Sequence, residues 1–414
     1  MALPEPLPAS TWHRSRWTIG WMASASGRVA TLRGAIVLAV LASPLLALQV
    51  GASDLAVYRH GASSLLHGRS LYAPSFAAGT ADHLPFTYPP FASIAALPLL
   101  PLPQGLTAEL WGVATIAMLA WCVRVAFRPL IERDPGRSDL TLAVMAAAFL
   151  ATRPVYDHLA DGQVDILLMT LCLADTVTVR PRWPRGLLVG IAAAIKLVPG
   201  IFIPYLWITG RRRAAGVAAG TFLICTAIAA LADLGDSHRY WTHLVFDTER
   251  PGRTAGYKNQ SLRGILLRVL APQGRPFLLA AAAGAIVVLG LARARRATYR
   301  GDLLAGATLV GLTGVLASPV SWIHSTVWII PALGVLVGAL ANRVRVWSGA
   351  VIALALFASL PYVPNLVHGL SRPAVVLLQR SFGLICLLLV LALPIVPHAE
   401  GEADSTAKRS NPRQ

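Results

Sequence analysis

Charged side chains are scarce in this 414-residue chain, where they make up 13% of the residues against 55% for hydrophobic ones. A soluble domain usually carries about 25% charged residues. Apolar stretches close to the roughly 20 residues needed to cross a bilayer recur from end to end. The low charge therefore argues against an ordinary soluble protein and predicts an all-α, polytopic membrane protein.

Acidic residues are few as well, 19 against 36 lysines and arginines, so the formal net charge is +17. In a soluble protein this balance would suggest nucleic-acid binding. Here the basic residues lie in tails and short loops between apolar runs, where Lys and Arg fix membrane topology. No basic stripe is interleaved with aromatic residues. We therefore expect membrane lipids, and no nucleic acid, as partners.

Cysteine is limited to four residues, all inside apolar runs and none in a CxxC pair: Cys122, Cys172, Cys225 and Cys386. Buried cysteine behaves as a small hydrophobic residue, so neither a disulfide nor a metal site is expected. The chain also lacks a Gly-rich phosphate loop and a Rossmann pattern. These absences exclude a nucleotide-binding fold, and we expect no cofactor.

About twelve apolar runs are candidate membrane spans. A basic segment of about 33 residues precedes the first run, far longer than the basic region of a secretory signal, so this run should stay attached. Residues 1–33 are expected to form a cytoplasmic tail, 34–397 the transmembrane domain and 398–414 a disordered cytoplasmic tail. The predicted spans are 34–51, 86–103, 106–127, 138–152, 163–180, 186–208, 213–233, 262–293 (broken near Pro272), 302–318, 322–341, 346–361 and 374–397.

Basic loops indicate the orientation of these spans. With twelve crossings, the N-terminal tail and the loops 210–216, 292–301 and 342–346 fall on one side, the cytoplasm. The loop 180–186 disagrees, because its three arginines fall outside; either the rule fails there or an early run such as the Pro-rich 86–103 is re-entrant. The segments assigned to the outside hold most polar aromatic residues, histidines and carboxylates: 51–85, 234–261, 317–325 and 361–373.

Asp54 follows the first apolar run directly and precedes a plausible short amphipathic helix on the membrane surface, LAVYRHGASSLLHG. One interpretation makes Asp54 the N-cap of that helix. The other makes it a base at the boundary of water and lipid, where partial burial would raise its pKa towards neutrality. The two interpretations do not exclude each other.

Lys196 lies about ten residues from either end of its predicted span, roughly 15 Å at 1.5 Å per residue. A lysine at mid-span costs roughly 2.5–3.5 kcal/mol on insertion scales. Snorkelling to an interface is one explanation, but the distance favours a polar cavity that would take an anion.

Three further stretches carry polar groups. RPVYDHLADGQVDILL (153–168) spaces aspartates by four, which suggests helix capping or, alternatively, a metal site; by parity it falls on the cytoplasmic side, away from Asp54. The donors of GYKNQSLRG at a helix start suggest an anion-binding mouth or an ordinary capped start. SPVSWIHS places His324 on the side of Asp54, where it serves either as a structural hydrogen-bonding group or as an aid to that carboxylate.

These stretches, together with LPFTYPPF and AAAIKLVPG, occur in an order that resembles the GT-C superfamily. Within it the chain is similar to the actinobacterial polyprenol-phosphate-mannose-dependent α-(1→2)-mannosyltransferases, which build phosphatidylinositol mannosides, lipomannan and lipoarabinomannan. The resemblance spans about residues 50 to 330. One departure is Asp165, because the family usually carries Asn after the GQV motif.

The resemblance implies about a dozen helices, a catalytic carboxylate in the first outer loop, here Asp54, and a contributing histidine, here His324. It implies a polyprenyl phosphomannose donor and a mannosylated glycolipid acceptor, used on the outer face of the plasma membrane. Transfer from a β-phosphomannose to an α linkage inverts the anomeric centre, which needs one base. Asp54 would take the proton of the acceptor 2-hydroxyl while cations stabilise the leaving phosphate.

Two sets of residues complete this hypothesis, and no metal is required if the cations suffice. The expected phosphate-binding residues are Lys196, Lys258, Arg263 and Arg59. Those expected to shape the sugar and acceptor pocket are Tyr58, His67, Tyr88, Gln260 and Trp322. Two alternatives stay open: a flippase or transporter of lipid-linked sugars, and a related transferase that uses another polyprenyl phosphosugar, such as arabinofuranose.

Overall fold

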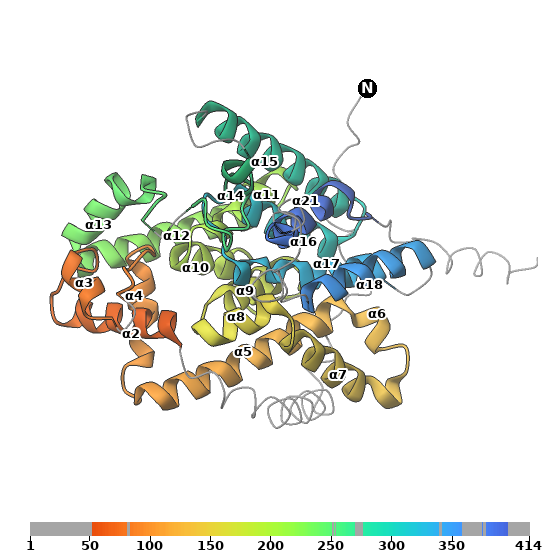
Figure 1. The fold of residues 1–414 in the computed structure, drawn as a ribbon, viewed down its shortest axis with the longest axis horizontal. Helices are drawn as coiled ribbons and strands as arrows, with labels where there is room; N and C mark the ends of the chain where they lie inside the picture. The colour runs from red at the N-terminus through yellow and green to blue at the C-terminus, as the bar shows by residue number, and fades with distance from the viewer. Residues whose placement is uncertain are drawn as a thin grey trace, which may run out of the picture.

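The fold is known from a computed structural model that describes residues 52–80, 83–250, 252, 254–269, 276–338, 342–357, 375 and 378–395. Within these ranges the chain is a bundle of helices and contains no strand, as the apolar runs predict (Figure 1). The predicted span 34–51, the loop 361–373 and both predicted tails, 1–33 and 398–414, lie outside the described residues.

Three described helices are long and apolar enough to cross a membrane: α5 Gln104–Ala126, α12 Arg212–Ala232 and α15 Pro276–Tyr299. A fourth results if α7 Ser138–Leu150 and α8 Arg153–Asp161, bent by 75°, form one span. The bend has a local cause: Pro154 lacks an N–H group, and its ring would clash with the carbonyl of residue 150 in a continuous helix. The structure supports a helical membrane protein but does not confirm twelve spans.

The core is built around α16 Leu303–Ala317, whose residues from Leu304 to Leu316 are all buried. It packs against α15 and three shorter apolar helices, α9 Asp165–Val177, α17 Ile329–Val337 and α21 Ser381–Ala392. Gly290 lies against Thr313 and Gly311 against the ring of Trp328, so closely that a Cβ atom at either glycine would clash. Small residues let helices approach closely where lipid surrounds them.

The first loop forms short helices: α2 Ser53–Leu66, α3 Pro74–Ala78, α4 Phe91–Ala95 and the 3₁₀ turn η3 Leu97–Leu99. The helix predicted after Asp54 is confirmed by α2. The predicted span at 86–103 is wrong, because the structure has only α4 and η3 there. The run is interrupted at Pro89, Pro90, Pro98, Pro101 and Pro103, and proline cannot donate the hydrogen bonds that a long helix needs.

The predicted span at 186–208 is also wrong, because it is broken in the middle. α10 Leu187–Ile195 ends at Lys196, whose backbone is extended, and η5 Val198–Ile201 and α11 Phe202–Ile208 follow. Gly186 before the break packs against the carbonyl of Ala214 after it, and Arg211 donates to the carbonyl of Thr176 at 3.0 Å. The segment therefore leaves and returns to the same end of the bundle.

Arginines cap helix carboxyl ends on this side of the molecule. Arg185 donates to the carbonyls of Asp175 and Thr178 at 3.0 and 2.7 Å, and Arg345 donates to those of Val335 and Leu336 at 2.6 and 2.9 Å. The last carbonyls of a helix lack partners within it and carry partial negative charge, so cations stabilise them. The basic loops thus have a structural role at this end.

The opposite end gathers the polar segments. α13 Leu234–Thr242 and η6 Leu244–Phe246 follow α12, and α13 lies beside the first loop (Figure 1). Asp236 joins the two, since its carboxylate accepts from the Ser70 hydroxyl at 2.6 Å and from the backbone N–H of Leu71 at 2.5 Å. The remaining elements are α6 Arg128–Ile131, η4 Pro135–Arg137, α14 Leu262–Val269, η7 Ile323–Trp328 and α18 Arg343–Phe357.

Candidate active site

The start of α2 rests on the turn between α8 and α9. The backbone N–H of Ala52 donates to the carbonyl of Ala160 at 2.9 Å, and Gly162 packs against Leu55 so tightly that a Cβ atom there would lie 2.7 Å from that of Leu55. Gly162 also has a φ of +68°, which favours glycine. The prediction that 153–168 lies on the side away from Asp54 is wrong, because the parity count included 86–103, which is not a membrane-spanning helix.

Asp54 lies in the first turn of α2 but does not cap it. The N-cap is Ala52, which makes no side-chain cap bond. The carboxylate instead faces Gln163, His324 and Asp161. Burial raises its pKa from 3.8 to about 6, although His324 and the side chain of Gln163 act to lower it. Such a group is ionised at neutral pH and still basic enough to take a proton.

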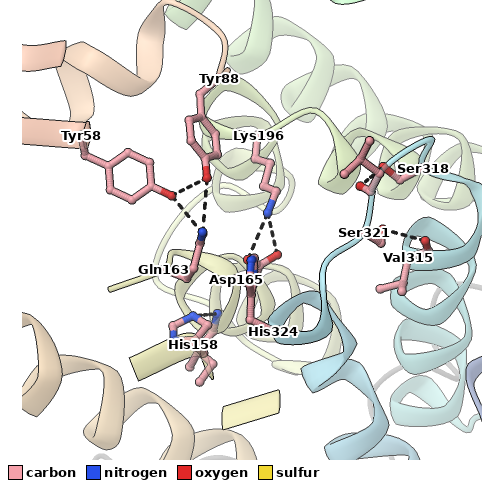
Figure 2. A network of polar contacts seen from close by, with 12 residues as sticks. Tyr58, Tyr88, His158, Gln163, Asp165, Lys196, Val315, Ser318, Ser321 and His324 are labelled. Carbon is pink, nitrogen blue, oxygen red and sulfur yellow. Dashed lines mark hydrogen bonds and ion pairs between the residues drawn. The ribbon is translucent and has the colours of Figure 1, made fainter. Parts of the chain in front are cut away.

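Two tyrosines orient the amide of Gln163. The hydroxyl of Tyr58 lies 2.7 Å from that of Tyr88 and 3.1 Å from Oε1 of Gln163, and the Tyr88 hydroxyl lies 3.4 Å from the same oxygen (Figure 2). All three side chains are buried. Because Oε1 accepts from the tyrosines, Nε2 is the amide atom left to donate to Asp54. Tyr58 and Tyr88, predicted for the sugar pocket, thus lie in the wall that holds the carboxylate.

Lys196 and His324 meet on one buried carboxylate, Asp165. The Nζ atom of Lys196 lies 2.9 and 3.0 Å from its two oxygens, and Nδ1 of His324 lies 3.0 Å from Oδ2 (Figure 2). The helix break at Lys196 places the ammonium inside the bundle, so the lysine does not snorkel. Its cost in the membrane interior is offset by an opposite charge.

Sequence reasoning did not recognise Asp165 as this partner. The available signal was an ionisable residue at the start of one apolar helix together with an unpaired lysine in the next. A narrow cavity borders the pair and is lined by Phe202, Trp328 and Ser325, among others. Its volume of about 30 Å³ gives room for water but is well below the roughly 300–1,000 Å³ of a usual small-molecule site.

The segment that carries His324 is fixed by Asn259. Its Nδ2 donates to the carbonyls of Thr254 and Pro319 at 2.9 and 3.1 Å, and its Oδ1 accepts from the N–H groups of Ser261 and Ser321 at 3.1 and 3.0 Å. The amide is fully buried. The stretch GYKNQSLRG, predicted as an anion-binding mouth or an ordinary helix start, therefore also joins loop 234–261 to the segment 317–325.

Three other predicted site residues make contacts away from Asp54. Arg59 donates to the carbonyl of Leu99 and, at 2.5 Å, to the hydroxyl of Thr107. His67 is exposed, with Nδ1 at 2.7 Å from the carbonyl of Ser63. The buried Gln260 donates to the carbonyls of Tyr257 and Gln379 at 2.8 and 2.9 Å and accepts from the N–H of Gly383. These contacts hold the first loop and α21 in place.

Lys258, Arg263 and Trp322 lie around loop 234–261. Lys258 is exposed, and its charge acts on the carboxylate of Asp161. Arg263 contacts the hydroxyl of Thr248 at 2.5 Å and Glu249 at 3.4 Å, and the ring of Trp322 lies near Gly252. Of the three, Lys258 is therefore linked to the site electrostatically, through Asp161.

Within the described ranges, no group of three or more His, Cys, Asp or Glu side chains has the arrangement of a metal site. Asp157, one of the aspartates whose spacing suggested a metal site as an alternative, pairs with Arg153 at 2.7 Å. Residues 86–319 match the model of glycosyltransferase family 87, which is more than half of the chain. The chain belongs to this family.

Relatives from mycobacteria agree with the family match. A polyprenol-phosphate-mannose-dependent α-(1-2)-phosphatidylinositol pentamannoside mannosyltransferase of Mycobacterium tuberculosis is 39% identical over 285 residues, 68% of this chain and 65% of the relative. A phosphatidylinositol mannoside mannosyltransferase of Mycolicibacterium smegmatis with the same donor dependence is 34% identical over 73% of each chain. No solved structure matches significantly.

The resemblance drawn from the ordered motifs is therefore confirmed. The family 87 match starts inside the LPFTYPPF stretch and ends inside SPVSWIH, so it covers Gln163 and the ion pair of Asp165 with Lys196, but neither Asp54 nor His324. Both relatives are named as mannosyltransferases that depend on polyprenol phosphate mannose. This chain spans 65% of the length of the pentamannoside enzyme, which is less than two thirds. The substrates of this chain are therefore proposed from the site.

Proposed function

We propose that this member of family 87 transfers mannose, with inversion, from a polyprenyl phosphomannose to a hydroxyl, specifically the 2-hydroxyl, of a mannosylated glycolipid. The donor and the glycolipid class are those in the names of its two mycobacterial relatives. The observation that carries the proposal is the carboxylate of Asp54, partly buried, with a pKa near 6, beside His324 and Gln163. An inverting transfer needs one such base.

In this mechanism the Asp54 carboxylate, which has the Gln163 side chain as a neighbour, takes the proton of the acceptor hydroxyl. The acceptor oxygen, as it loses its proton, attacks the anomeric carbon of the donor. The bond between that carbon and the phosphate breaks on the opposite face. Negative charge then grows on the leaving phosphate and needs cations nearby. His324 acts on the carboxylate of Asp54 and Lys258 on that of Asp161, so these two are best placed for the task, whereas Lys196 is paired with Asp165.

The same site bears on the two alternative functions, a flippase and a transferase for another sugar. A flippase would need polar groups along a path through both leaflets, whereas the described polar groups gather at one end, with Lys196 already paired to Asp165. Family 87 is also a glycosyltransferase family. A transferase for another polyprenyl phosphosugar would use the same base and cations, so it must be separated by experiment.

The donor assay tests the proposal. Membranes that contain the protein are expected to move label from polyprenyl phosphomannose into glycolipid, and not to move label from polyprenyl phosphoarabinose. Linkage analysis of the product should show a new mannose on a 2-hydroxyl. Transfer of arabinose alone would change the sugar and keep the enzyme class, and translocation of the donor without transfer would contradict the proposal.

The orientation is part of the proposal. If neither 86–103 nor 186–208 crosses, ten of the twelve predicted spans remain, counting 34–51 and others from the sequence alone. The loop 180–186 then falls on the same side as 210–216, 292–301 and 342–346, which removes the conflict in the basic loops. By the positive-inside rule that side is the cytoplasm, and Asp54 faces the outside of the plasma membrane.

Cysteine labelling checks this topology. The four native cysteines are buried, so an introduced one can be followed. With Arg182→Cys, we expect no reaction with a membrane-impermeant maleimide in intact cells and full reaction after permeabilisation. With Ala255→Cys, an exposed position in loop 234–261, reaction in intact cells is expected. Labelling of Arg182→Cys in intact cells would mean that the span count is wrong.

A further inference from the structure

Asp165, Lys196 and His324 come from three different elements and form a compact ionic cluster. Asp165 opens α9, Lys196 lies at the break after α10, and His324 belongs to η7. Asp165 is 9% exposed and His324 4%. Every contact within the cluster is between 2.9 and 3.0 Å. Such a buried arrangement persists only if each member has its partner, because removing one leaves an uncompensated charge.

The cluster decides which nitrogen of His324 carries a proton. An ionised carboxylate only accepts hydrogen bonds, so the contact between Asp165 Oδ2 and Nδ1 of His324 requires a hydrogen on Nδ1. Lys196 pairs with both oxygens of the same carboxylate and favours its ionised form. The bond made by one ring nitrogen fixes the state of the other. Nε2 is then the nitrogen that can gain or give a proton.

His324 also faces the proposed reaction site. In its protonated form it is, after burial itself, the largest electrostatic influence on Asp54 and on Asp161. Among the described residues Nε2 has no hydrogen-bonding partner, so this atom keeps its capacity to bind a substrate group. The neighbouring His158 differs, since its Nε2 accepts from the backbone N–H of Ile166 at 3.0 Å and is occupied.

We propose that Asp165 is a positioning residue: it holds His324 with the proton on Nδ1 and directs Nε2 to the space beside Asp54, while Lys196 keeps Asp165 ionised. The part played by Nε2 in transfer rests on the proposed function, but the state of the ring does not. A neutral Nε2 can accept a hydrogen bond from a sugar hydroxyl, and a protonated one can donate to the phosphate of the donor.

The first test reads the histidine ring directly and needs no enzymatic activity. Protein labelled with ¹⁵N-histidine in nanodiscs contains ten histidines, and loss of one signal in His324→Gln identifies the residue. Two double variants both lack the lysine charge because they carry Lys196→Met. The Asn variant adds Asp165→Asn and keeps an acceptor for Nδ1 of His324. The Leu variant adds Asp165→Leu and removes that acceptor. We expect a proton on Nδ1 in the wild type and the Asn variant, and on Nε2 of the neutral ring in the Leu variant.

The second test measures transfer with the same pair. Turnover of the Asn variant is expected to exceed that of the Leu variant at least tenfold, with a smaller change in KM for polyprenyl phosphomannose. When His324→Gln is added to both, this difference should disappear, since Asp165 acts through the ring. A merely structural carboxylate would instead leave the difference in place.

The outcomes separate this inference from the proposed function. The same ring state in the wild type and the Leu variant overturns the positioning role, whether or not transfer is found. A difference in turnover that persists without His324 overturns it as well. Absence of any transfer by the wild type contradicts the proposed function, and the ring state then still confirms or refutes the role of Asp165.

Discussion

Replacement of Asp54 by Asn is expected to lower mannose transfer by about 10²- to 10⁴-fold, the usual contribution of a general base. The amide has the shape of the carboxylate but cannot accept a proton from the acceptor hydroxyl. Initial rates with labelled polyprenyl phosphomannose measure the effect. The KM for the donor should change little, because the residue is proposed to act on the acceptor.

The thermal stability of Asp54→Asn distinguishes a loss of catalysis from misfolding. The pKa of Asp54 is higher in the folded protein, about 6, than the 3.8 of an unperturbed carboxyl. Its stabilising contribution is therefore complete below about pH 4 and is lost as the pH rises through 6, so at neutral pH the ionised group opposes folding. The Tm of Asp54→Asn should equal or exceed that of the wild type.

Asp233→Asn is a matched control. Asp233 caps α13 on the same side of the molecule by accepting from the N–H of Asp236 at 2.9 Å, and Asn caps a helix equally well. Its transfer rate should stay within about twofold of the wild type. If Asp54→Asn were as active as this control, Asp54 would not be the base.

The pH dependence of transfer follows from the same pKa. A base must be ionised, so kcat/KM of the wild type should rise with pH and level off above an apparent pKa near 6. Below pH 5 the rate should fall about tenfold for each unit. Rates measured between pH 4.5 and 8 check this limb, and a flat profile across pH 6 would contradict a base in this environment.

Much of this arrangement was accessible from the sequence. The apolar runs indicated the helical membrane class, and the ordered motifs led to the correct family. The positions of Asp54 after the first run and of His324 in SPVSWIH placed both on one side, and the structure brings them together. Each of these inferences depends on local pattern or on motif order, which a single sequence carries.

The errors arose where a long apolar run was taken to be one crossing. The prolines already marked 86–103 as a candidate re-entrant run, and the structure divides it into short turns; composition does not reveal that the backbone at Lys196 is extended. Since parity counts every crossing that precedes a segment, the run 86–103 alone moved 153–168 to the wrong side. The pairing of Lys196 with Asp165 was lost with it, because partners 31 residues apart were assigned to different environments.

Sequence patterns also fail to predict contacts between loops that lie far apart in the chain. Asn259 and Ser321 lie 62 positions apart, and no periodicity connects them. The stretch NQS suggested an anion-binding mouth because donors at a helix start favour one. The four bonds of the Asn259 amide go to backbone groups instead, and only the folded chain shows this. Its importance for the site can be measured.

Asn259→Ala is expected to destabilise the fold more than any of the other single substitutions, Asp54→Asn and Asp233→Asn included. It removes two donated and two accepted hydrogen bonds and leaves the carbonyl of Thr254 and the N–H of Ser321, both in buried residues, without this partner. An unsatisfied buried group costs about 1–3 kcal/mol, so a loss of about 2–4 kcal/mol and a clearly lower Tm are expected.

The same substitution should lower turnover at least tenfold in the protein that remains folded, because His324 follows the Ser321 contact by three residues and a displacement of about 1 Å can cost 10²-fold in rate. Asn342→Ala is the matched control: its amide is exposed and accepts one bond, from the N–H of Arg345 at 3.1 Å, at the opposite end of the bundle. That variant should lose at most about 1 kcal/mol and keep its turnover. Equal effects of the two variants on turnover would show that the Asn259 contacts do not hold His324 in its working position.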